Sequence, residues 1–274
     1  MTSQLIETIE DGVATLTMNR PEARNALTGE MGSALSEAVQ RLAGDPKVRV
    51  VVLTGAGGAF CAGGDVKSFA ADTSRGAAAA GGGGGGGFNF ESRAAGLRAG
   101  MEVTRWLHEM PKPTLAVIPG AAAGAGLSLA LACDLRIAAD GAKMTTAFSK
   151  VGLAGDYGGS YFLSHLVGAA KARELYFTAD VITGAQALAL GIVNKSVPAD
   201  QLDKAAGDYA RYLAGLPTLA VGYMKKNLNA ADHATLSEIL DLEATHMVRT
   251  MMTQDHAAAA AAFVEKKPPV FSGR

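Results

Sequence analysis

Cysteine and charge are both scarce in this chain. Its 274 residues include only two cysteines, Cys61 and Cys133, too few for a disulfide framework and at a spacing that matches no metal site. Charged residues make up 19% of the chain, and 25 basic against 26 acidic residues leave a formal net charge of −1. This balance argues against a general nucleic-acid or membrane-surface binder. We therefore expect a reduced, cytoplasmic protein with neither a nucleic-acid nor a membrane partner.

Long uninterrupted apolar runs are also lacking. The N-terminus has no basic start followed by an apolar stretch, so no targeting segment is predicted. The uncharged stretch from Pro113 to Cys133 is broken by Pro119-Gly120 and dominated by Ala and Gly, which favours a buried strand, a turn and a buried helix over a membrane span. Apolar residues make up 49% of the chain. That fraction, at this length, predicts a sizeable core and excludes disorder of the whole chain.

The first two thirds of the chain alternate short β-type runs with helical stretches. Thr28 is placed to cap a helix that runs to about Leu42, and an amphipathic helix is predicted over Ser92–Glu109. The alternation predicts an α/β core with parallel strand pairing. From about Asp200 the pattern becomes helical, so we expect a core over residues 1–199 and a helical region over residues 200–274. The predicted strands are Leu5–Ile9, Val13–Met18, Val48–Leu53, Pro113–Ile118 and Leu135–Ala138.

One segment between these elements consists almost entirely of glycine. Seven consecutive glycines, Gly81–Gly87, have no side chains to bury and the largest backbone entropy to lose. We expect this segment to be the most mobile internal part of the chain. A tolerated surface insertion and a loop over the substrate both fit it.

Two glycine-rich turns each follow a predicted buried strand. The first is Phe60–Asp65, with a helix expected to begin near Asp65. The second runs from Ile118 through Gly120, Gly124 and Gly126. Each turn places free backbone N–H groups at a helix N-terminus, and two such groups aimed at one oxygen form an oxyanion hole. Close helix packing explains the glycines equally well at this point.

Four motifs in order carry a family resemblance. They are the segment Asn19–Leu27, the turn Cys61–Asp65, the turn Gly120–Cys133 followed by Asp134, and Val151-Gly-Leu followed by Asp156-Tyr-Gly-Gly159. Together they resemble the crotonase (enoyl-CoA hydratase/isomerase) superfamily. The match runs from about Ile6 to Val197, and the tail Phe263–Phe271 is similar to the C-terminus of that family.

The resemblance implies a fold and a substrate class. The fold is an α/β, crotonase-like spiral of ββα units with a C-terminal helical oligomerisation region, assembled as a homotrimer or a dimer of trimers. The substrate is an acyl-CoA thioester, and no cofactor is expected because coenzyme A is part of the substrate. By resemblance, the thioester carbonyl accepts hydrogen bonds from the backbone N–H groups of Gly64 and Ala125.

The resemblance also implies further substrate-binding positions. Arg24 is the natural partner of a CoA phosphate, and Phe263, Lys266 and Lys267 match a tail that reaches the CoA of a neighbouring subunit. Phe148, Tyr157, Tyr161 and Phe162 suggest an apolar acyl pocket, although they fit a core as well. The implied substrate-binding set is Ala23, Arg24, Ala62, Asp65, Val66, Phe148, Phe263 and Lys266.

Both glutamates with which hydratases of this family activate water are missing. Ser128 stands at the first position and Phe148 at the second, and a serine without a base does not accept a proton near neutral pH. Asp156, expected after a short strand Ser149–Leu153, aligns with a lone acid found in several enoyl-CoA isomerases. Its alternative role is to cap the helix that begins near Gly158.

These residues predict an acyl-CoA-processing enzyme that stabilises a thioester enolate in an oxyanion hole. The leading hypothesis is an enoyl-CoA isomerase that shifts a double bond with Asp156 as its single acid and base. An enoyl-CoA hydratase or lyase, and a non-catalytic acyl-CoA-binding homologue, remain as alternatives.

Overall fold

The computed structural model describes residues 4–64 and 89–273, and two β-sheets organise this part of the chain. The larger sheet has the order β1-β2-β3-β4-β6-β9, in which β1 and β2 are antiparallel and the other pairs are parallel. The expected α/β class with parallel pairing is therefore confirmed. Its strands are β1 (Leu5–Glu10), β2 (Val13–Met18), β3 (Val50–Gly55), β4 (Thr114–Ile118), β6 (Leu135–Ala139) and β9 (Lys195–Val197).

The smaller sheet lies next to the larger one and is tied to it through the backbone. Its order is β5-β7-β8, and Cys61 pairs with Ala122 in a parallel bridge that joins the first glycine turn to β5. The second glycine turn is thereby held against the first. The strands are β5 (Ala122–Ala123), β7 (Lys143–Thr145) and β8 (Ile182–Thr183).

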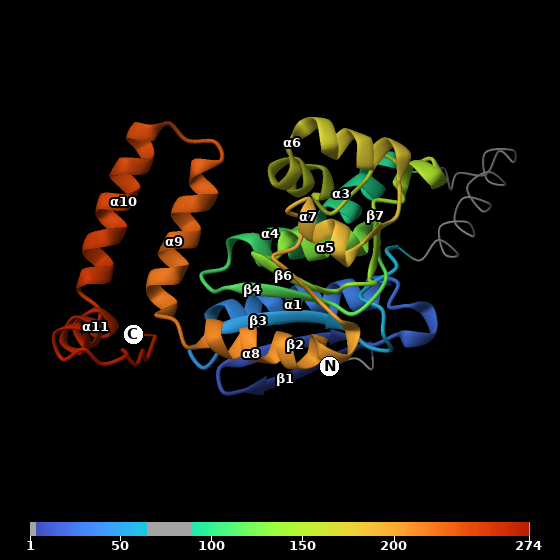
Figure 1. Cartoon of the computed structure of the whole chain (residues 1–274). Helices are drawn as coiled ribbons and strands as arrows, with labels where there is room; N and C mark the ends of the chain where they lie inside the picture. Colours follow the sequence, from blue (N-terminus) through green and yellow to red (C-terminus); the bar gives the residue numbers. More distant parts are fainter. Residues whose placement is uncertain (1–3, 65–88, 274) are drawn as a thin grey trace, which may run out of the picture.

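Helices cover both faces of the larger sheet. On one face α1 packs against α4, α4 against α5, and α5 against α6 (Figure 1). On the other face α8 packs against β2, β3 and β6. The side chains of β2 alternate accordingly, since Ala14, Leu16 and Met18 are fully buried toward the first face. These helices are α1 (Gly29–Gly44), α4 (Glu102–Glu109), α5 (Ala125–Ala132), α6 (Gly159–Thr178) and α8 (Leu202–Ala214), and the short α7 (Gly184–Ala189) precedes β9.

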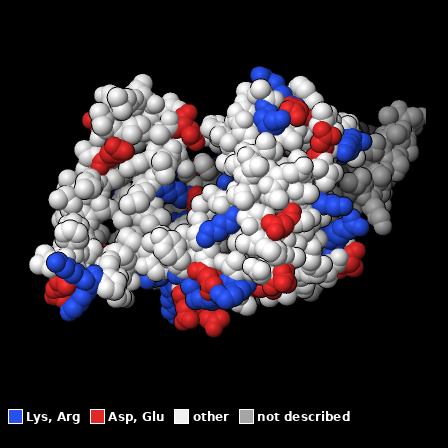
Figure 2. All heavy atoms as spheres, viewed as in Figure 1, with Lys and Arg blue, Asp and Glu red and all other residues white. Residues whose placement is uncertain are grey.

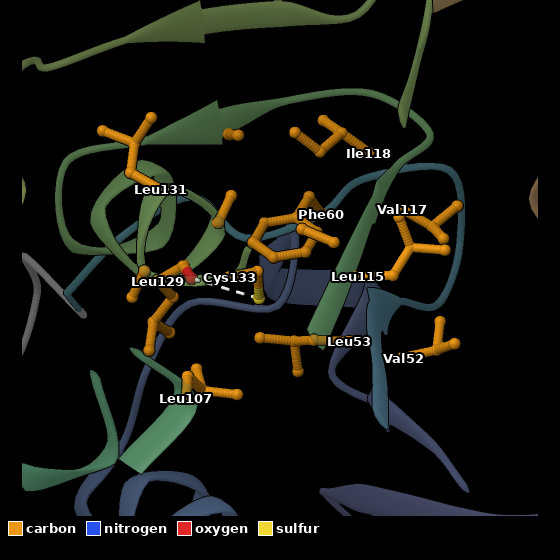
Figure 3. Packing of buried hydrophobic residues seen from close by; sticks show 14 of the residues in the cluster. Val52, Leu53, Phe60, Leu107, Leu115, Val117, Ile118, Leu129, Leu131 and Cys133 are labelled. Atoms are coloured by element: carbon orange, nitrogen blue, oxygen red, sulfur yellow. Dashed lines mark hydrogen bonds between the residues drawn. The ribbon is translucent and has the colours of Figure 1, made fainter. Parts of the chain in front are cut away.

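Apolar side chains from sheet, turn and helix meet in one core. Phe60, at the start of the first glycine turn, is fully buried between residues of β3, β4 and α5 (Figure 3). Thr28 caps α1 as expected, because its side chain accepts a hydrogen bond from the Met31 N–H at 3.1 Å. The turns that carry the candidate site thus stand on the most buried part of the molecule.

Two elements differ from those expected. The helix expected over Ser92–Glu109 is two helices, α3 (Phe90–Gly100) and α4, which meet at Met101 after a glycine, a poor helix former. The strand expected over Ser149–Leu153 is a 3₁₀ turn, η2 (Phe148–Val151), between left-handed residues Ala147 and Gly152 at φ 60° and 68°. Left-handed residues at both ends turn the chain too sharply for an extended strand. The Gly81–Gly87 prediction and the helix start near Asp65 lie outside the described residues.

Three helices at the C-terminus stand beside the sheet as an arm (Figure 1). They are α9 (Thr218–Ala231), α10 (Leu236–Met251) and α11 (Gln254–Val264). α9 and α10 pack on each other, yet the arm exposes large apolar side chains: Met224, Leu228, Leu236, Leu240, Met247 and Met251. Figure 2 shows mixed charges over the rest of this face and a mostly uncharged arm. No helix within the described residues is long and apolar enough to cross a membrane.

A buried ion pair fastens the arm to the sheet. The Lys225 ammonium on α9 donates to Asp134 Oδ2 at 2.8 Å and to the Leu107 carbonyl at 2.9 Å. Asp134 also accepts from the backbone N–H and the hydroxyl of Thr114, at 2.8 and 3.0 Å. Asp134 thus joins β4, β6 and α9 at one point.

Replacing Lys225 with methionine tests this anchor. The substitution leaves the Asp134 carboxylate without its cation, so we expect the free energy of unfolding to fall by about 3 kcal/mol. Lys226→Met, at the exposed neighbouring position, is the matched control and should change stability little. Chemical denaturation at neutral pH measures both, and equal effects of the two substitutions would contradict the anchor.

Candidate active site

The two glycine turns meet backbone to backbone. The Leu27 N–H donates to the Gly63 carbonyl at 2.7 Å, and the Ala123 N–H donates to the Cys61 carbonyl at 2.9 Å. Gly63 has φ +93°, and a Cβ there would lie 3.5 Å from the backbone nitrogen of Ala125. Within the described residues neither the Gly64 nor the Ala125 N–H has an acceptor. The two amide groups of the predicted oxyanion hole are therefore neighbours and free.

Close packing fixes the N-terminus of α5 beside the first turn. A Cβ on Gly126 would overlap the carbonyl oxygen of Cys61, so only glycine fits this position. Gly124 has φ 52°, and its N–H donates to the Thr145 carbonyl at 3.1 Å. Ala125 is the first residue of α5, where free N–H groups and the helix dipole favour negative charge.

A cavity of about 580 Å³ opens in front of these amides. Gly64, Ala125 and Asp156 all line it, so the structure brings the three predicted catalytic residues into one space. Tyr157 lies beside Asp156, and the remaining walls come from α1 and α3. Those wall residues are mostly small: Gly29, Gly32, Ser33, Ser36 and Glu37 from α1, Leu27 and Thr28 just before it, and Gly96, Leu97, Ala99 and Gly100 from α3.

Asp156 is held by a loop of unusual backbone conformation. Gly155, Tyr157 and Gly158 all have positive φ, at 109°, 51° and 74°. The N-cap of α6 is Gly158, which has no side-chain capping bond, so the alternative in which Asp156 caps the helix is wrong. Its Oδ1 atom is buried and has no hydrogen-bond partner within the described residues. A buried carboxylate oxygen without a partner is costly to fold and rare away from functional sites.

Burial changes the acidity of this carboxyl group. Removal from water raises the pKa of Asp156 to about 6 from its ordinary value of 3.8. The pKa of the nearby Tyr176 hydroxyl rises to about 12, through its own burial and then through the charge of Asp156. Asp156 is thus ionised at neutral pH but far more basic than an exposed aspartate, as proton transfer from carbon requires.

The two positions at which hydratases carry glutamates are closed off. Ser128 is 2% exposed, and its hydroxyl donates back to the Gly124 carbonyl at 3.3 Å. Phe148 is 7% exposed and stacks on Tyr176 with ring centroids 6.0 Å apart. Neither residue lines the cavity. Phe148, expected to bind substrate, instead lies in the packing behind Asp156.

The CoA-binding positions predicted before α1 contact the first glycine turn. The Arg24 carbonyl accepts from the Ala62 N–H at 2.9 Å, which joins Ala23 and Arg24 to the first glycine turn. The Arg24 side chain is exposed and makes no ion pair within the described part of the chain. Asp65 and Val66 lie outside the described residues.

The predicted tail residues are far from this cavity in the chain that carries them. Phe263, on α11, is 84% exposed, and Lys266 follows that helix with φ 55°. Figure 1 places α11 at the outer end of the arm, away from α5. The structure does not bring Phe263 or Lys266 to this chain's own site.

Sequence reasoning missed part of the cavity wall. Gly29, Gly32, Ser33 and Ser36 recur at helical spacing along α1, and this small-residue face was a readable signal. Glu37, an exposed carboxylate on the same wall, was also missed. The thiols of Cys61 and Cys133 are buried, which raises the pKa of each to about 12. They are therefore inert as nucleophiles.

Comparison with known proteins agrees with this geometry. The family model described as enoyl-CoA hydratase/isomerase matches residues 8–274. The chain belongs to this family, the crotonase superfamily. It is 35% identical over 270 residues, 98% of each chain, to the 1,2-epoxyphenylacetyl-CoA isomerase of Escherichia coli. It is 37% identical to the mitochondrial enoyl-CoA hydratase domain-containing protein 2 of Bos taurus, over 96% of this chain and 85% of that protein.

Solved structures show the same fold. An enoyl-CoA hydratase from a Polaromonas species superimposes with a TM-score of 0.88 at 34% identity, covering 97% of this chain and 99% of that one. The expected crotonase-like fold is confirmed, and so is the expectation of an enzyme of this superfamily.

The buried carboxylate makes a stability prediction. Because the pKa of Asp156 is raised in the folded state, the folded chain holds this proton more tightly than the unfolded chain, and stability falls as pH rises from about 4 to about 6. Asp156→Asn removes this loss. We expect the variant to exceed the wild type in free energy of unfolding by roughly 1–2 kcal/mol above pH 6, because partial exposure to solvent weakens the effect, with no gain near pH 4.

Denaturant unfolding across this pH range measures the difference. Glu37→Gln, at the exposed carboxylate on the same cavity wall, is the control and should show no such trend. A pH-independent difference between the Asp156 variant and the wild type would contradict the buried charge.

Proposed function

We propose that this chain is an enoyl-CoA isomerase that moves a carbon–carbon double bond by one-base proton transfer. The observation that carries the proposal is the carboxylate of Asp156, whose Oδ1 is buried without a hydrogen-bond partner within the described residues and which shares a cavity with the backbone N–H groups of Gly64 and Ala125. A base and an oxyanion site in one cavity are the two groups that such a shift needs.

The reaction follows from these groups. The thioester oxygen accepts hydrogen bonds from Gly64 and Ala125, which makes the α-proton of a 3-enoyl thioester more acidic. Asp156 removes this proton, and the electron pair of the C–H bond spreads into a dienolate whose negative oxygen the two amides stabilise. The protonated Asp156 then returns the proton to the γ-carbon. The product is the conjugated 2-enoyl thioester, and Asp156 is ionised again.

Hydration or lyase activity is the second candidate. Members of the same family are named hydratases, and Glu37 supplies a second carboxylate on the cavity wall. Against it, Ser128 and Phe148 are buried at the two positions where hydratases hold and activate water. A non-catalytic acyl-CoA-binding role is less well supported, since a binding protein has no need of an acid whose pKa is raised to about 6.

The proposed substrate is an acyl-CoA thioester, with coenzyme A as part of the substrate and no further cofactor. Arg24 is exposed and makes no ion pair within the described residues, so it is the proposed partner of a CoA phosphate. The proposed assembly is a homotrimer or a dimer of trimers. In it the Phe263 and Lys266 tail reaches the CoA of a neighbouring subunit, and the apolar arm is covered.

The proposal predicts the effect of removing the base. Asp156→Asn keeps the shape of the side chain but no longer accepts a proton, so kcat on a 3-enoyl-CoA should fall by about 10²–10⁴-fold. KM should change little, because the CoA contacts lie elsewhere. In the wild type kcat/KM should rise with pH and reach half its plateau near pH 6, where Asp156 ionises.

Crotonyl-CoA separates the two candidates, because hydration consumes its conjugated double bond and isomerisation does not. Steady loss of the enoyl absorbance on crotonyl-CoA would favour the hydratase. Retention of 3-enoyl-CoA isomerisation within threefold in the Asp156 variant would remove the proposed base.

The exposed arm predicts self-association. Sedimentation of the wild type at micromolar concentrations should give a trimer or hexamer, and Leu240→Glu together with Met247→Glu should shift it toward smaller species, since each charge lies on the apolar face. Arg211→Glu, on the exposed side of α8, is a control that should leave the assembly intact. A wild-type monomer would contradict the proposed assembly.

A further inference from the structure

A second cavity adjoins the candidate active-site cavity. It measures about 610 Å³ and is formed between α4, the start of α6 and α9. The two cavities share no residue but are lined by chain neighbours, because Gly100 and Tyr157 face the first while Met101 and Gly158 face the second. The two cavities are therefore adjacent at both points.

Tyr157 is the bulky residue at one of these points. Its backbone lies at φ 51°, a left-handed conformation that is rare for an aromatic residue. Such strain persists only where the surroundings impose it, and it concentrates at functional sites. Gly155 and Gly158 share the turn, so the loop accepts strain at Tyr157 and places an aromatic ring next to the catalytic carboxylate.

The Tyr157 ring extends to α3. A Cβ on Gly100 would lie 3.5 Å from the Tyr157 hydroxyl oxygen, so the hydroxyl lies next to a residue of α3 that has no side chain. The ring packs against the core cluster. Within the described part of the chain the hydroxyl makes no hydrogen bond. The contribution of Tyr157 at this point is therefore the volume of its ring.

The α6 side of the second cavity can take an alkyl chain. Gly158, Tyr161 and Phe162 line this side, next to Tyr157 in the chain, whereas the charged lining residues Arg98, Arg105, Glu109 and Lys226 lie on α3, α4 and α9. His108 packs its ring edge-on against Phe162 at 5.3 Å, and burial lowers its pKa. The imidazole is thus held neutral beside the Phe162 ring.

We propose that Tyr157 ends the acyl pocket, so that this chain prefers short acyl-CoA thioesters and longer ones enter only when the ring is removed. The inference rests on the proposed function in one respect, since it places the thioester at Gly64 and Ala125 with its acyl chain pointing past Asp156. The second cavity is then the space into which a longer chain extends.

Tyr157→Gly tests this limit, because glycine adopts the left-handed backbone without strain and removes the whole side chain. The probes are saturated straight-chain acyl-CoA thioesters from butanoyl to dodecanoyl, with binding followed by calorimetry. In the wild type, affinity should stop rising after the first short chains. In the variant it should keep rising by about fourfold per methylene, the gain expected for burying one more CH₂ group.

Two control variants separate the effect of the Tyr157 ring from those of its hydroxyl and of the size of the second cavity. Tyr157→Phe keeps the ring and loses the hydroxyl, so it should bind the series as the wild type does. Tyr161→Ala enlarges the second cavity without removing the Tyr157 ring, and it should leave the length preference unchanged. If Tyr157→Gly does not fold, Tyr157→Asn removes the ring with a residue that also tolerates positive φ.

The possible outcomes are distinct. If Tyr157→Gly and Tyr157→Asn both keep the chain-length preference of the wild type, Tyr157 does not end the acyl pocket. The same conclusion follows if Tyr161→Ala also gains affinity for longer chains. The binding series does not depend on turnover, so it tests the limit at Tyr157 even if the wild type isomerises none of the matching 3-enoyl thioesters. Absence of isomerisation in the wild type would end the proposed isomerase function. A length preference that shifts to longer chains in Tyr157→Gly would still support Tyr157 as the limit of the pocket.

Discussion

The site depends on the absence of side chains between two backbones. The first glycine turn and the N-terminus of α5 touch directly, since a Cβ at Gly126 would overlap the Cys61 carbonyl. Backbone pairing of Cys61 with Ala122 holds this contact, and the buried ring of Phe60 supports it from below. Any larger residue would push the free amides of Gly64 and Ala125 apart. The smaller sheet and α5 are thus positioned by one steric requirement, the absence of a side chain at Gly126.

The cost of the site appears at Asp156. Its Oδ1 is buried without a partner among the residues that the structure describes, which destabilises the folded chain, and the left-handed backbone of Tyr157 adds strain beside it. The surrounding structure has to hold both. Ser128 and Tyr176 pack so closely on Gly159 that a Cβ there would overlap both hydroxyl oxygens, which fixes the start of α6 and hence the loop before it. Stability and reactivity are therefore set by the same short segment.

The arm is attached to the sheet at a distance from the candidate site. Lys225 and Asp134 join α9 to the ends of β4 and β6, so the arm and the second cavity keep a defined position relative to the sheet. That cavity lies between the arm and the core. Tyr157 lies where the loop that carries Asp156 meets α3, next to this cavity.

The sequence by itself determined the α/β class, the cap at Thr28, both glycine turns and the family, because these follow from periodicity, local hydrogen bonding and contiguous motifs. It left the role of Asp156 open, since an aspartate before a helix reads equally as a cap. Only the tertiary structure decided that it is not the cap, by placing Gly158 at the N-cap and burying Oδ1 of the carboxylate without a partner among the described residues. The split of α3 from α4, the turn at Phe148–Val151 and the small-residue cavity wall also depended on packing between distant segments. Local secondary-structure propensity carries no information about which side chains, distant in the sequence, line the same cavity.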